Sequence, residues 1–313
     1  MSKAFVFPGQ GSQFVGMGKD FADNFASAKD VFEEVDEALN EKLSAMIFEG
    51  TIEDLTMTRN TQPALMATSI AITRTIEKQS GKKLSDMCHY VAGHSLGEYS
   101  ALCAAGAISL SDTAKLLRIR GNAMTDAVPQ GQGSMAALIG TDYEQAAKIS
   151  KEVSGYGVCQ AANDNGGGQV VISGDAKAID QAIIAAQNYG IKRAVKLAVS
   201  APFHCELMLP AAKIMEDALG IVNLKSPNVP LIANVTADVV IDSEDIKKLL
   251  VKQVTGTVRW RESVLKLKEK GINKIVEFGA GKVLSTLVKR IDSDIESSSV
   301  QTVEDMEAFL KEI

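Results

Sequence analysis

Short apolar runs alternate along the chain with longer segments in which apolar residues recur every three or four positions. Four of these runs have the length and the bounding residues of buried strands, at residues 4–7, 90–92, 231–235 and 274–278. Helical spacing fills the intervals between them. Because parallel strands are joined by crossover helices, this alternation predicts an α/β domain with helices on both faces of a parallel sheet.

The middle of the chain has a different order of elements: strand, helix, two strands, helix and strand. The predicted strands are 135–139, 158–163, 169–173 and 192–199, and the predicted helices are 143–153 and 176–189. This β-α-β-β-α-β order is the ferredoxin-like split motif. We therefore expect a small domain at 127–199, inserted into a large domain formed by 1–126 and 200–313.

The composition is that of an ordinary soluble protein. Of 313 residues, 46% are hydrophobic and 23% are charged, and the formal net charge is -6. A negative chain offers no whole-molecule attraction to nucleic acid or to an anionic membrane surface. No apolar run approaches the roughly 18 residues that span a bilayer, and the N-terminal segment lacks the apolar core of a secretory signal. We expect a cytoplasmic protein that binds neither nucleic acid nor membrane.

The four cysteines give no sign of a metal site or a disulfide framework. Cys88, Cys103, Cys159 and Cys205 lie far apart, without CxxC spacing. We expect them to be small buried apolar side chains.

Residues 93–97 read GHSLG and fit the pattern GxSxG. They follow the predicted strand at 90–92 and precede a segment rich in small residues, which lets a helix pack closely against a sheet. In this context GxSxG is typical of a nucleophile elbow, where glycines relieve crowding around a strained serine. We predict that Ser95 is a nucleophile and that the Leu96 N–H, at the start of a helix, stabilises an oxyanion.

Only three histidines are available as the base that a serine nucleophile needs. His94 is adjacent to Ser95 and is expected to point to the other face of the sheet, and His89 lies near the far end of the same strand. His204 lies between a predicted strand and a helix, in a loop that can reach the carboxyl edge of the sheet. We therefore predict a Ser95–His204 dyad. Because no Asp or Glu is evident as a third member, we expect a carbonyl group to orient the imidazole.

One arginine falls on the apolar face of a predicted helix. Leu116 and Met124 mark that face by their helical spacing, Arg120 lies between them, and Arg118 lies nearly opposite. A buried guanidinium needs an anion, and its planar fork suits a carboxylate. A salt bridge within the chain and a receptor for a substrate carboxylate both remain open at this point.

The first predicted strand ends in the loop PGQGSQ at 8–13. This loop lacks the third glycine of GxGxxG and the lysine of a P-loop, so a nucleotide site is not indicated. A second oxyanion donor beside Ser95 is the better use of its exposed N–H groups and amide side chains.

Four features, taken together and in order, resemble the malonyl-CoA:acyl carrier protein transacylases of fatty acid synthesis. They are FPGQGSQ at 7–13, GHSLGEYSAL at 93–102, Arg120 within RIRG, and SAPFH ending at His204. The similarity runs over essentially the whole chain, including VEFGAGKVLSTL at 276–287. It implies a large α/β-hydrolase-like domain interrupted by a small ferredoxin-like one, with the active site in the cleft between them.

The resemblance also implies a role for each matching residue. Ser95 is the acylated nucleophile, His204 is its base, and Arg120 binds the malonyl carboxylate. Gln10 and the Leu96 N–H line the oxyanion hole.

The resemblance reaches two further residues and the acyl selectivity. Gln253 matches a family glutamine whose backbone carbonyl orients the histidine, whereas Asn163 stays outside the catalytic set because its loop looks longer than the family's. Leu96 and Phe203 follow the malonyl-accepting pattern rather than the methylmalonyl-accepting one.

We therefore expect ping-pong transfer of a malonyl group from coenzyme A to acyl carrier protein, by a monomer that needs no metal or redox cofactor. A serine esterase or thioesterase would show the same elbow and dyad, and a non-catalytic acyl-binding module could keep the same fold. Lys192, Arg193 and Lys196 are candidates for a positive patch that docks the acidic carrier protein.

Overall fold

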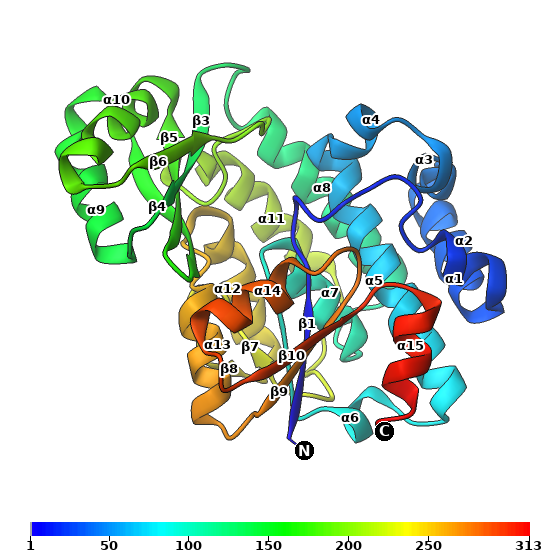
Figure 1. Cartoon of the computed structure of the whole chain (residues 1–313). Helices are drawn as coiled ribbons and strands as arrows, with labels where there is room; N and C mark the ends of the chain where they lie inside the picture. Colours follow the sequence, from blue (N-terminus) through cyan, green and yellow to red (C-terminus); the bar gives the residue numbers. More distant parts are fainter. Residues whose placement is uncertain (1) are drawn as a thin grey trace.

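A six-stranded sheet organises the larger part of the chain (Figure 1). Its strands are β1 (Lys3–Phe7), β2 (Tyr90–Gly93), β7 (Leu231–Ile232), β8 (Val239–Val240), β9 (Lys274–Phe278) and β10 (Glu296–Val300). The spatial order is β10-β9-β1-β2-β7-β8, and all neighbouring strands are parallel except β7 and β8. The structure is a computed structural model that describes residues 2–313.

Helices cover both faces of this sheet, so the predicted α/β class with a parallel sheet is confirmed. The helices before the small lobe are α1 (Lys19–Asn24), α2 (Ala26–Leu39), α3 (Leu43–Glu49), α4 (Ile52–Thr56), α5 (Thr58–Ser80), α6 (Leu84–Met87), α7 (Leu96–Ala104) and α8 (Leu110–Asp126). Those after it are the 3₁₀ turn η3 (Glu206–Met208), α11 (Leu209–Ile221), α12 (Ser243–Thr255), α13 (Trp260–Glu269), α14 (Val283–Ile291) and α15 (Val303–Leu310).

Strand β1 shows how the sheet divides the core into two layers. Phe5 and Phe7 belong to the apolar cluster that includes α5, α7 and α8, whereas Ala4 and Val6 belong to the cluster formed with α13 and α14. All four side chains are fully buried. Alternate residues of a strand face opposite sides, so a strand that reads as a continuous apolar run is buried on both faces.

The sheet departs from the sequence prediction at three strands. The strand predicted at 231–235 pairs only over Leu231–Ile232, because the chain then turns toward the loop that leads to β8. Strand β8 lies outside the predicted strands, because its two residues are too short a run to be recognised as a strand. Strand β10 was not predicted, since its sequence ESSSV has no apolar run and it lies at the edge of the sheet.

The middle of the chain forms a second sheet, in the green lobe of Figure 1. It consists of β3 (Gly133–Ile139), β4 (Cys159–Gly166), β5 (Gln169–Asp175) and β6 (Arg193–Lys196), with helices α9 (Tyr143–Glu152) and α10 (Ala176–Ala186) and the 3₁₀ turns η1 (Ser154–Tyr156) and η2 (Gln187–Tyr189). The strands are antiparallel in the order β4-β5-β3-β6. The two helices and the sheet share a separate apolar cluster.

The β4–β5 hairpin joins the small lobe to the large one. Asn163 forms an isolated parallel bridge with Val258, and the Asp164 N–H donates to the Val258 carbonyl at 2.9 Å. The buried Asp164 carboxylate accepts from Arg261 Nε at 2.9 Å. His94, directly after β2, contacts Asn165 of the same hairpin at 2.9 Å, so these contacts hold the hairpin beside the end of β2.

The four cysteines are all free, but their burial differs from the prediction. Cys88 and Cys205 are buried, whereas Cys103 and Cys159 are only partly buried, because α7 and β4 carry them at the margins of their clusters.

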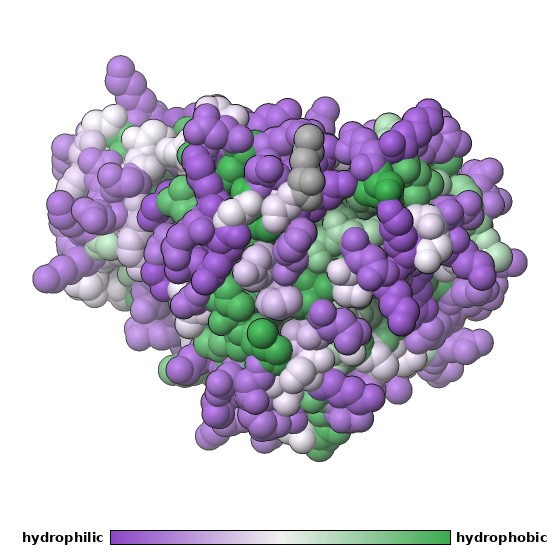
Figure 2. Space-filling view, turned by 90° about the horizontal axis from the view of Figure 1, so that it is seen from below, coloured by the Kyte–Doolittle hydropathy of each residue, from purple (hydrophilic) through white to green (hydrophobic). Residues whose placement is uncertain are grey.

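In residues 2–313 there is no helix with the length and apolar character that a membrane crossing requires. The face seen from below is mainly hydrophilic, with hydrophobic residues in smaller patches (Figure 2).

Candidate active site

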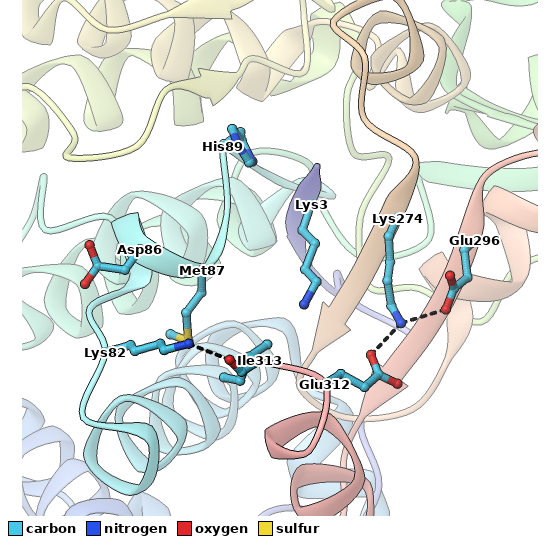
Figure 3. Close-up of a pocket in the computed structure, with 9 residues that line it drawn as sticks. All are labelled: Lys3, Lys82, Asp86, Met87, His89, Lys274, Glu296, Glu312 and Ile313. Carbon is cyan, nitrogen blue, oxygen red and sulfur yellow. Dashed lines mark hydrogen bonds and ion pairs between the residues drawn. The ribbon is translucent and has the colours of Figure 1, made fainter. Parts of the chain in front are cut away.

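Two hollows lie at opposite ends of the large sheet. One, of about 490 Å³, lies at the amino ends of β1, β9 and β10 (Figure 3). Its floor is a set of ion pairs in which Lys274 Nζ contacts both Glu296 and Glu312 at 2.6 Å. The other, of about 110 Å³, lies at the carboxyl ends of the strands and contains every site residue predicted above except Gln253, which lies directly behind it. Ligands of open α/β sheets bind at this carboxyl edge.

Ser95 lies at the turn from β2 to α7 with φ 55° and ψ -110°, a strained conformation for a residue with a side chain. The two glycines of the motif are required by close backbone contacts. A Cβ on Gly93 would lie 1.9 Å from the Gly97 carbonyl oxygen, and a Cβ on Gly97 would lie 2.2 Å from the Phe7 carbonyl oxygen. The elbow is therefore packed directly against the end of β1.

His204 meets Ser95 across the cleft. Its Nε2 is 2.8 Å from Ser95 Oγ, and its Nδ1 is 2.8 Å from the Gln253 carbonyl oxygen. A carbonyl can only accept, so Nδ1 carries the proton and Nε2 is left to accept from the serine hydroxyl. Within residues 2–313 no carboxylate contacts the imidazole, so a carbonyl orients it.

Burial, followed by the nearby Arg120 cation, lowers the pKa of His204 to about 3. The imidazole is therefore neutral at ordinary pH and able to take a proton. Within residues 2–313 neither of the other two histidines hydrogen-bonds to Ser95 Oγ. His94 lines the same cavity, but its Nε2 is 2.9 Å from Asn165 Oδ1 and its ring packs on Trp260, while His89 precedes β2 at the amino end of the sheet.

Arg120 projects from α8 into the site and is 1% exposed. Its Nη2 donates to Ser95 Oγ at 3.0 Å and to Gln253 Oε1 at 2.8 Å, and its Nη1 donates to Gln62 Oε1 at 2.8 Å. All three acceptors are neutral. Within residues 2–313 no carboxylate lies in ion-pair contact with Arg120. The salt bridge that the sequence left open is thus not formed among these residues, and a buried cation faces the cavity without an ion-pair partner.

The two residues predicted to donate to the oxyanion, Gln10 and Leu96, line the same cavity as Ser95. Leu96 is the first residue of α7, so its N–H has no acceptor within the helix. Gln10 lines the same cavity and its Nε2 donates weakly to Thr58 Oγ1 at 3.3 Å. The loop that carries Gln10 packs on the elbow so closely that a Cβ on Gly9 would lie 2.6 Å from the His94 carbonyl oxygen.

The structure adds residues that the sequence reasoning missed. Asn234 Oδ1 accepts from the Ser95 N–H at 2.8 Å, and Asn234 Nδ2 donates to the Gly93 carbonyl at 2.7 Å. The sequence hint for Asn234 is that it is a polar residue within the apolar run 231–235. Two more residues were missed: Glu98, which accepts from Gln253 Nε2 at 2.7 Å, and Gln62, which accepts from Arg120 Nη1 at 2.8 Å. The sequence gives no hint of either role, because a single polar residue in a predicted helix is expected to be exposed to solvent.

The remaining wall of the cavity is mostly apolar. It is formed by Met124, Met135, Leu197, Val199 and Phe203, with Asn163 from the small lobe and His94 beside it. Both lobes therefore contribute to the cavity. Asn163, which the sequence analysis leaves outside the catalytic set, lines the same cavity as Ser95 and His204.

Comparison with known proteins now places the chain. Residues 4–307 match the acyl transferase domain family. A malonyl CoA-acyl carrier protein transacylase of Bacillus subtilis is 47% identical over 99% of this chain and 97% of its own length. The chain belongs to the malonyl-CoA:acyl carrier protein transacylase family. The resemblance read from the four sequence features is confirmed.

Solved structures extend this transacylase likeness to the whole chain. An acyl-carrier-protein-S-malonyltransferase from Bartonella henselae is 56% identical, with a TM-score of 0.97 over 99% of both chains. A malonyl-transacylase in complex with a type II PKS acyl-carrier protein is 39% identical, with a TM-score of 0.96 over 100% of both chains. Both lobes of this transacylase family member are therefore part of the shared fold.

Proposed function

We propose that this chain transfers a malonyl group from coenzyme A to the pantetheine thiol of acyl carrier protein, through an ester on Ser95. The observation that carries the proposal is Arg120, a buried cation 3.0 Å from the Ser95 hydroxyl that forms no ion pair within residues 2–313. A carboxylate on the acyl group supplies that anion. The names of the relatives support both the malonyl group and the carrier protein.

The first half-reaction acylates the enzyme. His204 Nε2 takes the proton from Ser95 Oγ as that oxygen attacks the thioester carbon, and the Leu96 N–H and Gln10 hold the oxyanion. Collapse of the intermediate breaks the C–S bond, and the coenzyme A thiolate leaves with the proton from His204. The malonyl group is then bound to Ser95 Oγ through an ester bond.

The second half-reaction runs the same path in reverse. His204 deprotonates the carrier thiol, the thiolate attacks the ester carbon, and Ser95 leaves as an alkoxide that regains the proton. The first half-reaction exchanges a thioester for an ester and the second exchanges that ester for a thioester, so the atoms balance without a metal or a redox cofactor.

The two lobes have complementary parts in this proposal. The large one, 1–126 with 200–313, corresponds to an α/β-hydrolase-like domain that carries the elbow and the base. The small one, 127–199, corresponds to a ferredoxin-like domain, supported by its strand order β6-β3-β5-β4 and its two helices.

The carrier protein docks on basic residues of the small lobe. Of the three candidates, Lys196 is paired with Asp180 at 2.7 Å, so the exposed side chains of Lys192 and Arg193 are the ones proposed for docking. We propose that the enzyme is a cytoplasmic monomer serving fatty acid synthesis.

Mass analysis of the intact protein after incubation with malonyl-CoA tests the proposal. We expect a gain of one malonyl group on Ser95, discharged faster by carrier protein than by buffer. An ester that forms and is lost to water at the same rate with or without carrier protein would instead indicate a serine esterase or thioesterase. Retention of malonyl-CoA without any covalent gain would indicate an acyl-binding module.

The low pKa of His204 predicts an unusually flat pH dependence of acylation. A histidine with the ordinary pKa near 6.5 would lose roughly thirtyfold of its base form between pH 8 and pH 5. Because burial and Arg120 lower the pKa of His204 to about 3, the base form persists over that whole range. We expect kcat/KM for malonyl-CoA, which reports the free enzyme, to fall by less than about threefold. A break near pH 6.5 would contradict this.

A further inference from the structure

The side-chain amide of Gln253 must be held in one of its two orientations for Arg120 to keep its place. Gln253 Oε1 accepts from Arg120 Nη2 at 2.8 Å, while Gln253 Nε2 donates to the Ser95 carbonyl at 2.9 Å. If the amide turned over, its NH₂ group would face the guanidinium, donor against donor, and its oxygen would face the Ser95 carbonyl.

Glu98 supplies the shortest of three contacts that hold this orientation: Gln253 Nε2 donates to Glu98 at 2.7 Å, to the Ser95 carbonyl at 2.9 Å and to Asn234 Oδ1 at 3.4 Å. Glu98 lies in the first turn of α7, is 1% exposed, and has an oxygen that accepts from Gln253 Nε2 at 2.7 Å and from the Asn234 N–H at 3.3 Å. Hydrogen bonds to such a buried acceptor are costly to lose, because the donors left behind stay buried and unpaired. Glu98 does not touch the cavity, so it acts on the site only through its neighbours.

Two amides hold the Arg120 guanidinium, and the Gln253 amide has the stronger hydrogen bonds behind it. Gln62 holds the opposite nitrogen, and within residues 2–313 its amide makes one further hydrogen bond, a weak 3.8 Å contact from Nε2 to Met124 Sδ. Within residues 2–313 nothing accepts a hydrogen bond from Arg120 Nε. Of the two amides that hold the guanidinium, the one that contacts Glu98 is therefore the more firmly held.

We propose that Glu98 is a positioning residue for acyl selectivity: it locks the Gln253 amide so that Arg120 stays aimed at the acyl group on Ser95. The inference rests on the proposed function, since selectivity for a carboxylate has meaning only if such an acyl group is the substrate. It concerns selectivity rather than the attack itself, because the contact from Gln253 to His204 is made by the backbone carbonyl and does not depend on the amide.

The feature of Glu98 that matters is its accepting oxygen and not its charge. Burial raises the pKa of Glu98 to about 7, so both protonation states are populated at neutral pH. A neutral carboxyl group still has an accepting carbonyl oxygen, and so does a glutamine side chain. Glu98→Gln should therefore preserve the function, whereas Glu98→Leu, which keeps much of the volume but has no acceptor, should lose it.

The test is the ratio of Ser95 acylation rates with malonyl-CoA and acetyl-CoA, measured on one preparation of each variant. A ratio is independent of the folded fraction, so loss of stability alone leaves it unchanged. We expect Glu98→Leu to lower the ratio about tenfold, the effect of one hydrogen bond lost around a charged donor, and Glu98→Gln to keep it within about twofold.

Glu277→Leu is the matched control. Glu277 is fully buried in β9, and its carboxylate accepts from the N–H groups of Leu284 and Ser285 at 3.1 and 2.8 Å, away from the cavity. Its loss should lower stability and leave the ratio unchanged. The inference is overturned if Glu98→Leu keeps the wild-type ratio, or if Glu98→Gln loses as much as Glu98→Leu. A wild-type enzyme without malonyl preference would instead remove the proposed function.

Discussion

Replacement of Ser95 by alanine is expected to lower malonyl transfer by about 10⁴-fold or more, to the background of the assay. Ser95 Oγ is the one hydroxyl within residues 2–313 that His204 Nε2 contacts. Without it the imidazole has no proton to take from the enzyme, and no ester can form. The same loss is expected for His204→Ala, since the members of such a pair act as a unit. Transfer of radiolabelled malonate to carrier protein, with the mass of the intact enzyme, measures both.

Ser100→Ala gives the matched control for this prediction. Ser100 lies in α7, five residues after Ser95, is fully buried, and its Oγ has no hydrogen-bond partner among residues 2–313. Its replacement should leave both the transfer rate and the mass gain unchanged. A malonyl mass gain that persisted in Ser95→Ala would place the nucleophile on another residue and defeat the mechanism.

The two reacting side chains share an uncommon backbone conformation. Ser95 and His204 have φ of 55° and 60°, and the only other non-glycine residues in the described chain with positive φ are Asn40 and Ala237. Such conformations cost about 1–3 kcal/mol each and persist only where the surrounding structure imposes them. Here the two hydrogen bonds between Asn234 and the elbow, and the one between His204 Nδ1 and the Gln253 carbonyl, are part of that constraint. The strain presents both side chains to one point of the cavity.

The motif and the histidines show what local sequence can predict. GxSxG indicates a tight turn because only glycine fits where two backbones pass within van der Waals contact, and the structure shows those passes at Gly93 and Gly97. His204 was chosen by elimination, and the structure brings it to Ser95. Arg120 followed from helical periodicity, which places it on the buried face of α8. Each of these inferences depends on spacing within a short segment.

The supports of the site could not be predicted in this way. Asn234 meets Ser95 from 139 positions away, and Gln253 meets Glu98 from 155 positions away. Those contacts depend on how β7 and α12 lie against the elbow, which no local pattern specifies. Strand β10 was missed for a related reason: its serines are stabilised by pairing with β9 rather than by an apolar run. Long-range register, and not residue type, decides both cases.

Replacement of Arg120 by alanine is expected to lower the preference for malonyl-CoA over acetyl-CoA by roughly a hundredfold or more, the usual effect of truncating one partner of a buried ion pair. In the proposed reaction the malonyl carboxylate keeps its charge throughout, so we expect Arg120 to bind the ground state and the transition state alike. The loss should therefore appear mainly as a higher KM for malonyl-CoA, with acetyl transfer much less affected. Steady-state kinetics with both donors measure this.

Arg118→Ala separates this effect from the loss of any arginine in α8. Arg118 lies two residues earlier and pairs with Glu41 at 2.6 Å, while its other nitrogen donates to the Arg59 carbonyl at 2.8 Å. These partners lie outside the cavity, so Arg118→Ala should change stability and leave the malonyl-to-acetyl ratio as it is. If Arg120→Ala also kept the ratio, its guanidinium would serve only to bind Gln62 and Gln253 in the core. Selection of the acyl group would then fall to the apolar wall around Met124 and Phe203, which offers nothing that a carboxylate would prefer over a methyl group.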